Sequence, residues 1–150
     1  MIKKVFFDSD VILDVILKRL PHFEPSQQVL SLAESGLLSG HTSSLIIANC
    51  YDIIWHIKDH KSALKAVSKL RVFLNIVPFT DKEISQSLNA ESKDFEDALE
   101  YFICINNGIN NLITRNISDY RKLQINALSP KDFLNLEEIK TIIEEPGNND

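Results

Sequence analysis

Several aspartates occupy positions from which acidic side chains can meet in a folded chain. Asp8 directly follows an apolar run, and Asp119 follows another apolar run after a short polar turn. Asp94 and Asp97 lie three residues apart at the expected start of a helix, so they share one face of it. Neighbouring carboxylates raise each other's pKa unless a cation is present, and Mg²⁺ and Mn²⁺ prefer such hard oxygen ligands. A bound divalent ion can deprotonate water and stabilise charge on a phosphate, so this pattern indicates phosphodiester chemistry.

The same pattern predicts a role for each acidic residue. The expected metal ligands are Asp8, Asp97 and Asp119, whereas Asp94 is expected to support these ligands or to activate water. Each role has a simpler alternative, since Asp8 can be a solvated loop carboxylate and Asp119 an ordinary turn residue. Asp94 can equally be the N-cap of the helix that carries Asp97, and Asp10 either caps the first helix or joins the metal site.

Apolar runs alternate with segments of helical periodicity along the sequence, and these elements must position the acidic residues. Strands are expected over residues 3–7, 37–41, 75–79, 111–114 and 124–128. Helices are expected from near Asp10, from Pro25, after an N-cap among residues 42–44, from Lys61, after Thr80 or Asp81, from Phe95 and after Ser129. This alternation, without repeat or linker, predicts an α/β fold with one parallel sheet flanked by helices. Ligands bind such sheets beyond the carboxyl ends of the strands, so the acidic residues converge there if the first and fourth strands are neighbours.

The composition is that of an ordinary folded domain. The chain has 150 residues, of which 44% are hydrophobic and 25% are charged, so we expect one domain over residues 1–143 and a flexible tail over 144–150. Cys50 and Cys104 stand among apolar residues and are expected to be buried free thiols in a reducing compartment. The sequence shows neither a membrane-spanning apolar run nor the start of a signal peptide, so we expect a cytoplasmic protein without membrane contact.

The net charge of -5 is unfavourable for contact with nucleic acid, because affinity for a phosphate backbone usually comes from a cationic face. An acidic metal site contributes carboxylates to this count, and a bound divalent ion would neutralise part of their charge.

Three segments resemble PIN domains and occur in the order expected for that family. They are VFFDSDVILDVILKR, DFEDALEYF, and LITRNISDY followed by INALSPKDFL, and together they extend over about residues 3 to 134. The resemblance implies a three-layer sandwich whose central parallel sheet has about five strands. It also implies a Mg²⁺- or Mn²⁺-dependent endoribonuclease that cleaves RNA, forms a homodimer and, as in VapC-type toxins, is inhibited by a partner antitoxin protein.

The resemblance also gives roles to individual residues. It makes Asp8 the first acid of the site, Asp97 the acid of the helix start and Asp119 the acid after a Thr-Arg-Asn turn. In that turn, Thr114 and Asn116 would orient the chain and Arg115 would contact phosphate.

One position departs from the family pattern. Many active PIN domains carry a glutamate in the third helix, where the stretch SSLIIANCYDI places Asn49. An amide oxygen can bind water or a metal but carries no negative charge, so metal affinity would be lower unless Asp52, one turn later, compensates.

Two other functions stay open on the sequence. Because of Asn49, a noncatalytic PIN fold that binds RNA or protein is one alternative. The other is a phosphatase of the haloacid-dehalogenase type, whose nucleophile loop DSDV resembles, with Asp8 as nucleophile and Asp10 as acid/base. That family also needs a downstream lysine at a strand end, and the sequence has no convincing candidate.

Overall fold

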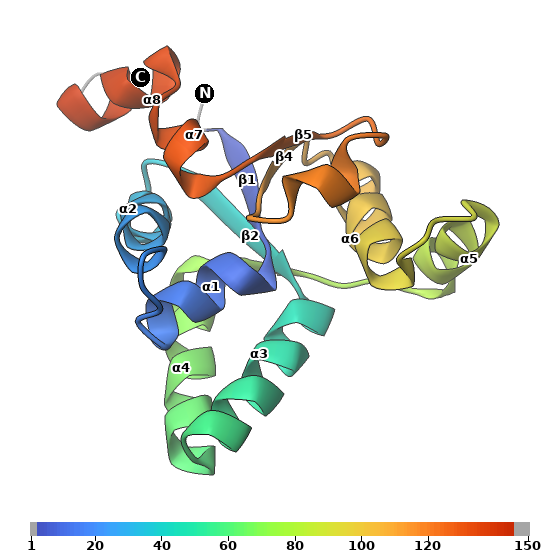
Figure 1. Cartoon of the computed structure of the whole chain (residues 1–150), viewed down its shortest axis with the longest axis horizontal. Helices are drawn as coiled ribbons and strands as arrows, with labels where there is room; N and C mark the ends of the chain where they lie inside the picture. Colours follow the sequence, from blue (N-terminus) through green and yellow to red (C-terminus); the bar gives the residue numbers. More distant parts are fainter. Residues whose placement is uncertain (1–2, 146–150) are drawn as a thin grey trace.

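A central sheet of parallel strands organises the computed structural model, which describes residues 3–145 (Figure 1). The strands are β1 (Lys4–Phe7), β2 (Ser39–Ser43), β3 (Asn75–Val77), β4 (Asn111–Ile113) and β5 (Asn126–Leu128). They form one 5-stranded sheet in the order β3-β2-β1-β4-β5, and each neighbouring pair is parallel. The predicted α/β architecture is therefore confirmed.

Helices connect successive strands and cover the sheet on both sides. They are α1 (Ser9–Ile16), α2 (Phe23–Glu34), α3 (Ser44–Ile57), α4 (His60–Phe73), α5 (Asp81–Asn89), α6 (Phe95–Asn106), the 3₁₀ helix η1 (Ile117–Tyr120), α7 (Pro130–Leu134) and α8 (Glu137–Glu144). Figure 1 shows α1 and α2 on one side of the sheet and α5 and α6 on the other. Of the predicted flexible tail, Glu144 still belongs to α8, and residues 146–150 lie outside the described residues.

The middle of the sheet is fully buried and leads directly to the acidic residues. Val5, Phe6 and Phe7 in β1 have no exposed surface, which explains why this strand reads as an uninterrupted apolar run. The strand order reverses at β1, which pairs with β2 on one side and with β4 on the other. The backbone amide of Asp8 extends the second pairing by donating to the Ile113 carbonyl at 3.0 Å. The expected adjacency of the first and fourth strands is thus confirmed.

Short polar side chains cap several helices as predicted, whereas α1 and α2 differ in detail from the prediction. Ser43 caps α3, Thr80 caps α5 and Ser129 caps α7 through backbone amides of the first turn. α1 begins at Ser9, near Asp10 as predicted, but the alternative that Asp10 caps this helix is wrong, because Asp8 is the N-cap and accepts a hydrogen bond from the Ser9 amide. α2 also begins earlier than predicted, so Pro25 lies within its first turn, where a missing amide proton costs no helical hydrogen bond.

The described residues contain no helix long and apolar enough to cross a membrane. Both cysteines are buried free thiols, as the sequence predicted.

Gly40 marks a tight contact between β2 and the helix layer. A Cβ atom built at this position would lie 2.8 Å from Ala33 Cβ and 2.8 Å from Leu74 Cδ2. Because neighbouring side chains fill the space, we expect Gly40→Ala to lower the free energy of unfolding by roughly 1–3 kcal/mol. Urea titration followed by circular dichroism measures this change, and an unchanged midpoint would mean that α2 moves aside at no cost.

Candidate active site at the carboxyl ends of β1 and β4

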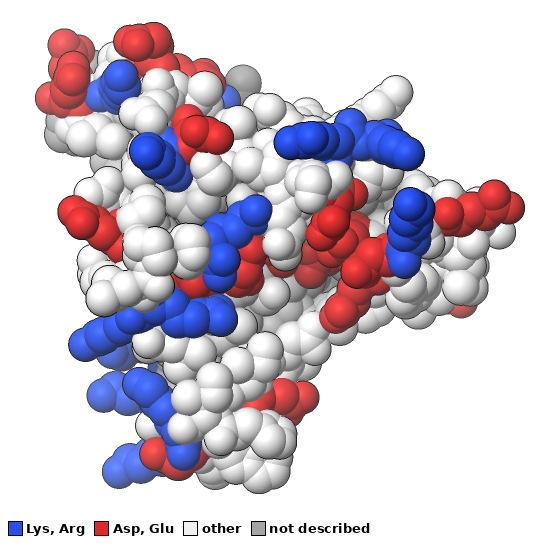
Figure 2. All heavy atoms as spheres, viewed as in Figure 1, with Lys and Arg blue, Asp and Glu red and all other residues white. Residues whose placement is uncertain are grey.

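An acidic crevice of about 480 Å³ lies at the edge of the sheet where β1 and β4 end. Its lining comes from the start of α1, from α3, from α6 and from the segment after β4: Asp8, Ser9, Asn49, Asp52, Ile53, Asp94, Glu96, Asp97, Glu100, Asn116 and Asp119. Figure 2 shows Asp and Glu side chains gathered on this part of the surface. The fold therefore brings together all of the predicted acidic site residues.

Asp8 forms the floor of the crevice and is only 6% exposed. Its Oδ2 accepts a hydrogen bond from the Thr114 hydroxyl at 2.8 Å, and its Oδ1 accepts one from the Ser9 amide at 2.7 Å. Burial raises the pKa of Asp8, although both hydrogen bonds favour the charged form. The alternative of a solvated loop carboxylate is therefore wrong.

Glu100 is an acidic residue of the site that the sequence reasoning missed. It lies on α6 with only 5% of its surface exposed, and its Oε2 accepts a hydrogen bond from the Tyr120 hydroxyl at 2.9 Å. Burial, followed by the charge of Asp8, raises the pKa of Glu100 well above its usual range. A signal was present, because Glu100 follows Asp97 by three residues and so shares its helix face.

Asp97 carries an oxygen atom that no protein group satisfies. Its Oδ1 accepts a hydrogen bond from the Tyr120 hydroxyl at 3.2 Å, whereas its Oδ2 is buried without a hydrogen-bond partner among the described residues. Burial and then the charges of Asp94 and Asp119 raise the pKa of Asp97 to about 7. An unsatisfied buried carboxylate oxygen is costly, so this atom is suited to a ligand.

Asp94 serves first as a helix cap. Its Oδ1 accepts a hydrogen bond from the Asp97 amide at 3.0 Å, which confirms the N-cap alternative, and the residue also lines the crevice.

The turn after β4 delivers Asp119 to the crevice. The Asn116 amide donates to the Thr114 hydroxyl oxygen at 3.1 Å, and the Asp119 amide donates to the Asn116 carbonyl at 3.2 Å. Asp119 lies in η1, and Asn116 and Asp119 are both exposed at the crevice. Thr114 contributes its side chain to the turn, and Asn116 contributes its backbone amide and carbonyl.

The side chain of Arg115 is engaged with α1 rather than with the crevice. Its side chain binds the buried carboxylate of Asp14 in α1, with Nε 2.8 Å from Oδ2 and Nη2 3.0 Å from Oδ1. It is not among the residues that line the crevice. These contacts leave the predicted role of Arg115 in binding phosphate without support.

Asn49 lies in α3, the third helix, as the sequence predicted, and it lines the crevice. Its amide group donates a hydrogen bond to Glu96 Oε1 at 2.8 Å, and Asp52, one turn later, also lines the crevice. The third helix therefore contributes an amide and a more distant carboxylate, and the additional buried acid of the site comes from α6.

The donor set fits a hard divalent cation. Among residues 3–145, no three or more His, Cys, Asp or Glu side chains lie in an arrangement that could by itself hold a metal ion, so protein ligands alone would not complete its shell. Mg²⁺ usually rests on one or two protein carboxylates and completes its shell with water and phosphate oxygens. The unsatisfied oxygen of Asp97 and the raised pKa values of Asp8 and Glu100 are features that a bound cation would relieve.

Comparison with known proteins identifies relatives. A model of the PIN domain matches residues 4–118, a range that ends one residue before Asp119. The chain is 28% identical to "Ribonuclease VapC1" of Aquifex aeolicus (strain VF5) over 136 residues, which is 87% of this chain and 93% of that protein.

Solved structures share the fold at low sequence identity. VapBC2 of Rickettsia felis, bound to a DNA fragment from its promoter, gives a TM-score of 0.65 with 16% identity over 84% of this chain and 98% of that one. VapC20 of Mycobacterium tuberculosis, described as a toxin that cleaves the sarcin-ricin loop, gives 0.63 with 14% identity over 81% and 98%.

The position of Glu100 yields a test of the metal site. We expect Glu100→Gln to weaken Mn²⁺ binding by roughly tenfold or more, because the change removes a buried negative charge from the crevice. Without metal, the variant should be at least as heat-stable as the parent, since one of the crowded carboxylates is gone. Isothermal titration with Mn²⁺ and thermal unfolding in EDTA measure the two effects.

Glu96→Gln is the matched control, because Glu96 lines the same crevice but is exposed on the surface. Equal Mn²⁺ affinity in the parent and in Glu100→Gln would show that Glu100 does not contribute to metal binding.

Proposed function

The chain belongs to the PIN domain family, and on this basis we propose that it is a divalent-metal-dependent endoribonuclease that cleaves RNA. The observation that carries the proposal is the convergence of Asp8, Asp97, Glu100 and Asp119 on one crevice at the carboxyl edge of the sheet. The similarity to a ribonuclease over 87% of the chain supports the same activity.

Asp8, Asp97 and Asp119 would hold the cation, and Glu100 would support it from the buried side of the crevice. The hard oxygen donors fit Mg²⁺ or Mn²⁺. When bound, such an ion lowers the pKa of water and offsets the charge that develops on the phosphate during cleavage.

The chain's own residues fix the acidic groups before any substrate arrives. Thr114 and Ser9 each donate to a different oxygen of Asp8, which sets the rotation of this carboxylate. The Tyr120 hydroxyl contacts both Asp97 and Glu100 and so links two neighbouring acids of α6. Groups that are held in place need no reorganisation during the reaction, which favours catalysis. Ser9, Asn49 and Asn116 are the neutral polar residues of the lining, and the amide groups of Asn49 and Asn116 are suited to contact RNA.

The two alternatives from the sequence are weaker than the nuclease. Glu100 supplies a buried carboxylate that makes up for the missing acid at Asn49, which argues against a noncatalytic module. In a phosphatase, Asp10 would act as acid/base, but its Oδ1 accepts from the Val11 amide at 2.7 Å and its Oδ2 from the Arg115 amide at 2.9 Å. A carboxylate with both oxygens bound to backbone amides is poorly placed to exchange protons with a substrate.

A toxin of a toxin-antitoxin pair is the cellular role that best fits the relatives. The structures that resemble this chain include a toxin-antitoxin complex from Klebsiella pneumoniae and VapBC2 from Rickettsia felis. We infer that this chain likewise acts on cellular RNA as a homodimer and is held inactive by an antitoxin protein.

Asp8→Asn should abolish metal-dependent RNA cleavage and leave the fold intact. Asparagine caps helices as well as aspartate does, so α1 keeps its start while the site loses a charge. Cleavage of single-stranded RNA with Mn²⁺, with and without EDTA, measures the loss, and Asp132→Asn on the exposed face of α7 is the control. Parent-level cleavage by Asp8→Asn would place the active site elsewhere.

Growth of a bacterial host tests the proposed role as a toxin. Induced expression of the parent chain should arrest growth because cellular RNA is cut, whereas induced Asp8→Asn at the same protein level should not. Equal growth of both cultures, combined with RNA cleavage by the purified parent, would contradict the toxin role and leave the nuclease intact.

A further inference from the structure

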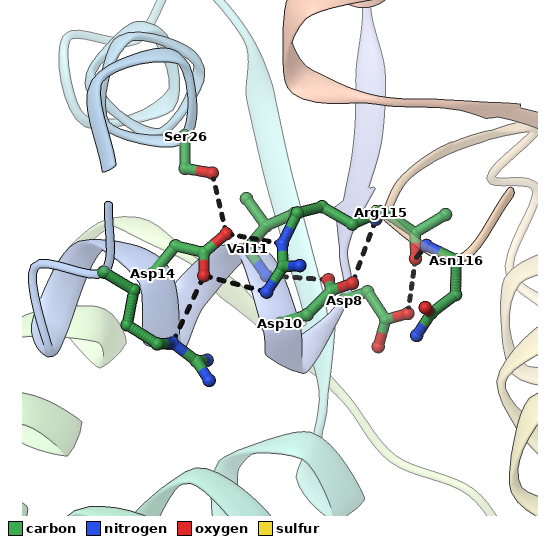
Figure 3. Close-up of polar contacts among 9 residues, drawn as sticks. Asp8, Asp10, Val11, Asp14, Ser26, Arg115 and Asn116 are labelled. Carbon is green, nitrogen blue, oxygen red and sulfur yellow. Dashed lines mark hydrogen bonds and ion pairs between the residues drawn. The ribbon is translucent and has the colours of Figure 1, made fainter. Parts of the chain in front are cut away.

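Asp14 is a fully buried carboxylate that does not line the acidic crevice. It lies on α1, and Figure 3 shows it between α2 and the turn after β4. Arg115 reaches it with two nitrogen atoms, at 2.8 Å and 3.0 Å, in a fork that matches both carboxylate oxygens. The Ser26 hydroxyl donates to Oδ2 at 3.3 Å, and Arg19 Nε lies 3.2 Å from Oδ1.

Stability alone gives no good reason for this ion pair. Asp14 is fully buried and Arg115 keeps 30% of its side chain exposed. Burying charged groups costs hydration energy, and well-packed apolar residues of similar volume are often at least as stable. An ion pair differs from an apolar contact in that it fixes the relative orientation of two segments. Here those segments are α1 and the turn at residues 114–116, which are far apart in sequence.

The backbone of this turn is bound to the same helix. The Arg115 amide donates to Asp10 Oδ2 at 2.9 Å, so the side chain and the backbone of Arg115 both hold α1 (Figure 3). The hydroxyl of Thr114, the residue before Arg115, donates to Asp8 Oδ2 at 2.8 Å. The amide of Asn116, the residue after Arg115, donates to the Thr114 hydroxyl oxygen at 3.1 Å. A shift of the turn would therefore move the group that orients Asp8.

We propose that Asp14 and Arg115 form a positioning pair that holds the turn at residues 114–116 against α1 and thereby sets the geometry of the metal-binding carboxylates. The pair acts through Thr114 on Asp8, and through the chain that leads into η1 on Asp119. Its effect on metal affinity rests on the proposed metal-dependent function, whereas its effect on the turn does not.

Arg19 provides a matched control within the same cluster. Arg19 forms an ion pair with Asp14, but its Nε and Nη2 atoms have no hydrogen-bond partner among the described residues. It lies in the loop between α1 and α2, whereas Arg115 belongs to the turn after β4. Arg19→Gln removes a positive charge next to Asp14 and leaves every contact of the turn in place. The comparison of Arg19→Gln with Arg115→Gln therefore separates the charge on Asp14 from the fork that fixes the turn.

The test is a double-variant cycle read by Mn²⁺ titration on folded protein. Asp14→Asn and Arg115→Gln should each weaken Mn²⁺ binding roughly tenfold, as changes behind metal ligands commonly do. The double variant should also lose roughly tenfold rather than a hundredfold, because both changes break one interaction. Arg115→Lys keeps the charge without the fork and should resemble Arg115→Gln, while Arg19→Gln should bind Mn²⁺ within about twofold of the parent.

RNA cleavage adds a readout that general destabilisation does not move. A positioning pair predicts that kcat falls in Asp14→Asn and Arg115→Gln while KM stays within about twofold. A rise in KM for Arg115→Gln alone would instead show that Arg115 contacts RNA and would overturn the proposal. Losses that multiply in the double variant, or an equal loss in Arg19→Gln, would overturn it as well.

Amide hydrogen exchange on the metal-free protein tests the positioning pair without relying on metal binding or RNA cleavage. The amide of Arg115 should exchange faster in Asp14→Asn and Arg115→Gln than in the parent and in Arg19→Gln. If the parent cleaves no RNA but this pattern holds, the ribonuclease proposal fails and the positioning pair stands. If the parent cleaves RNA and the Arg115 amide is equally protected in all variants, only the positioning pair fails.

Discussion

The parallel pairing of β1 with β4 is the constraint on which the site depends. It joins residues at the start of the chain to residues more than a hundred positions later, and the Asp8 amide continues it beyond the last residue of β1. Both strands end at the same edge of the sheet, so their following segments emerge side by side. Without this pairing, Asp8 and the turn at residues 114–116 would have no reason to meet, and the hydroxyl of Thr114 could not orient the first acid.

Carboxylate crowding is the second feature that shapes the crevice. Asp8, Asp97 and Glu100 all have raised pKa values, and burial is the largest cause in each case. Folding thus holds these groups in an arrangement that is unfavourable for isolated charges, which is the usual condition of a functional site. Tyr120 partly offsets the strain by donating to two of the acids, and the unsatisfied Asp97 oxygen is where a cation would complete the arrangement.

The polar groups on the two sides of α1 have different tasks. Asp8 faces the crevice, whereas Asp14, nearly two turns later, is fully buried and contacts Ser26 and the partly exposed Arg115 and Arg19. Asp10 lies between them and accepts the backbone amide of Arg115. The acidic residues in and before this short helix therefore have different partners: Asp8 lines the crevice, Asp10 accepts a backbone amide of the turn, and Asp14 forms ion pairs with arginines.

The sequence by itself determined the alternation of strands and helices, most helix caps, and the acids that follow β1 and β4. These features depend on the spacing of apolar side chains and on hydrogen bonds between residues a few positions apart. Both can be read from a short segment of the sequence. Only the tertiary structure decided that Glu100 lies buried among the acids, that Asp8 rather than Asp10 caps α1, and that Arg115 binds Asp14 instead of facing the crevice. Burial and the choice of an ionic partner depend on packing between distant segments, which for Arg115 and Asp14 are about a hundred residues apart. A local sequence pattern therefore does not show which of several acids an arginine will bind.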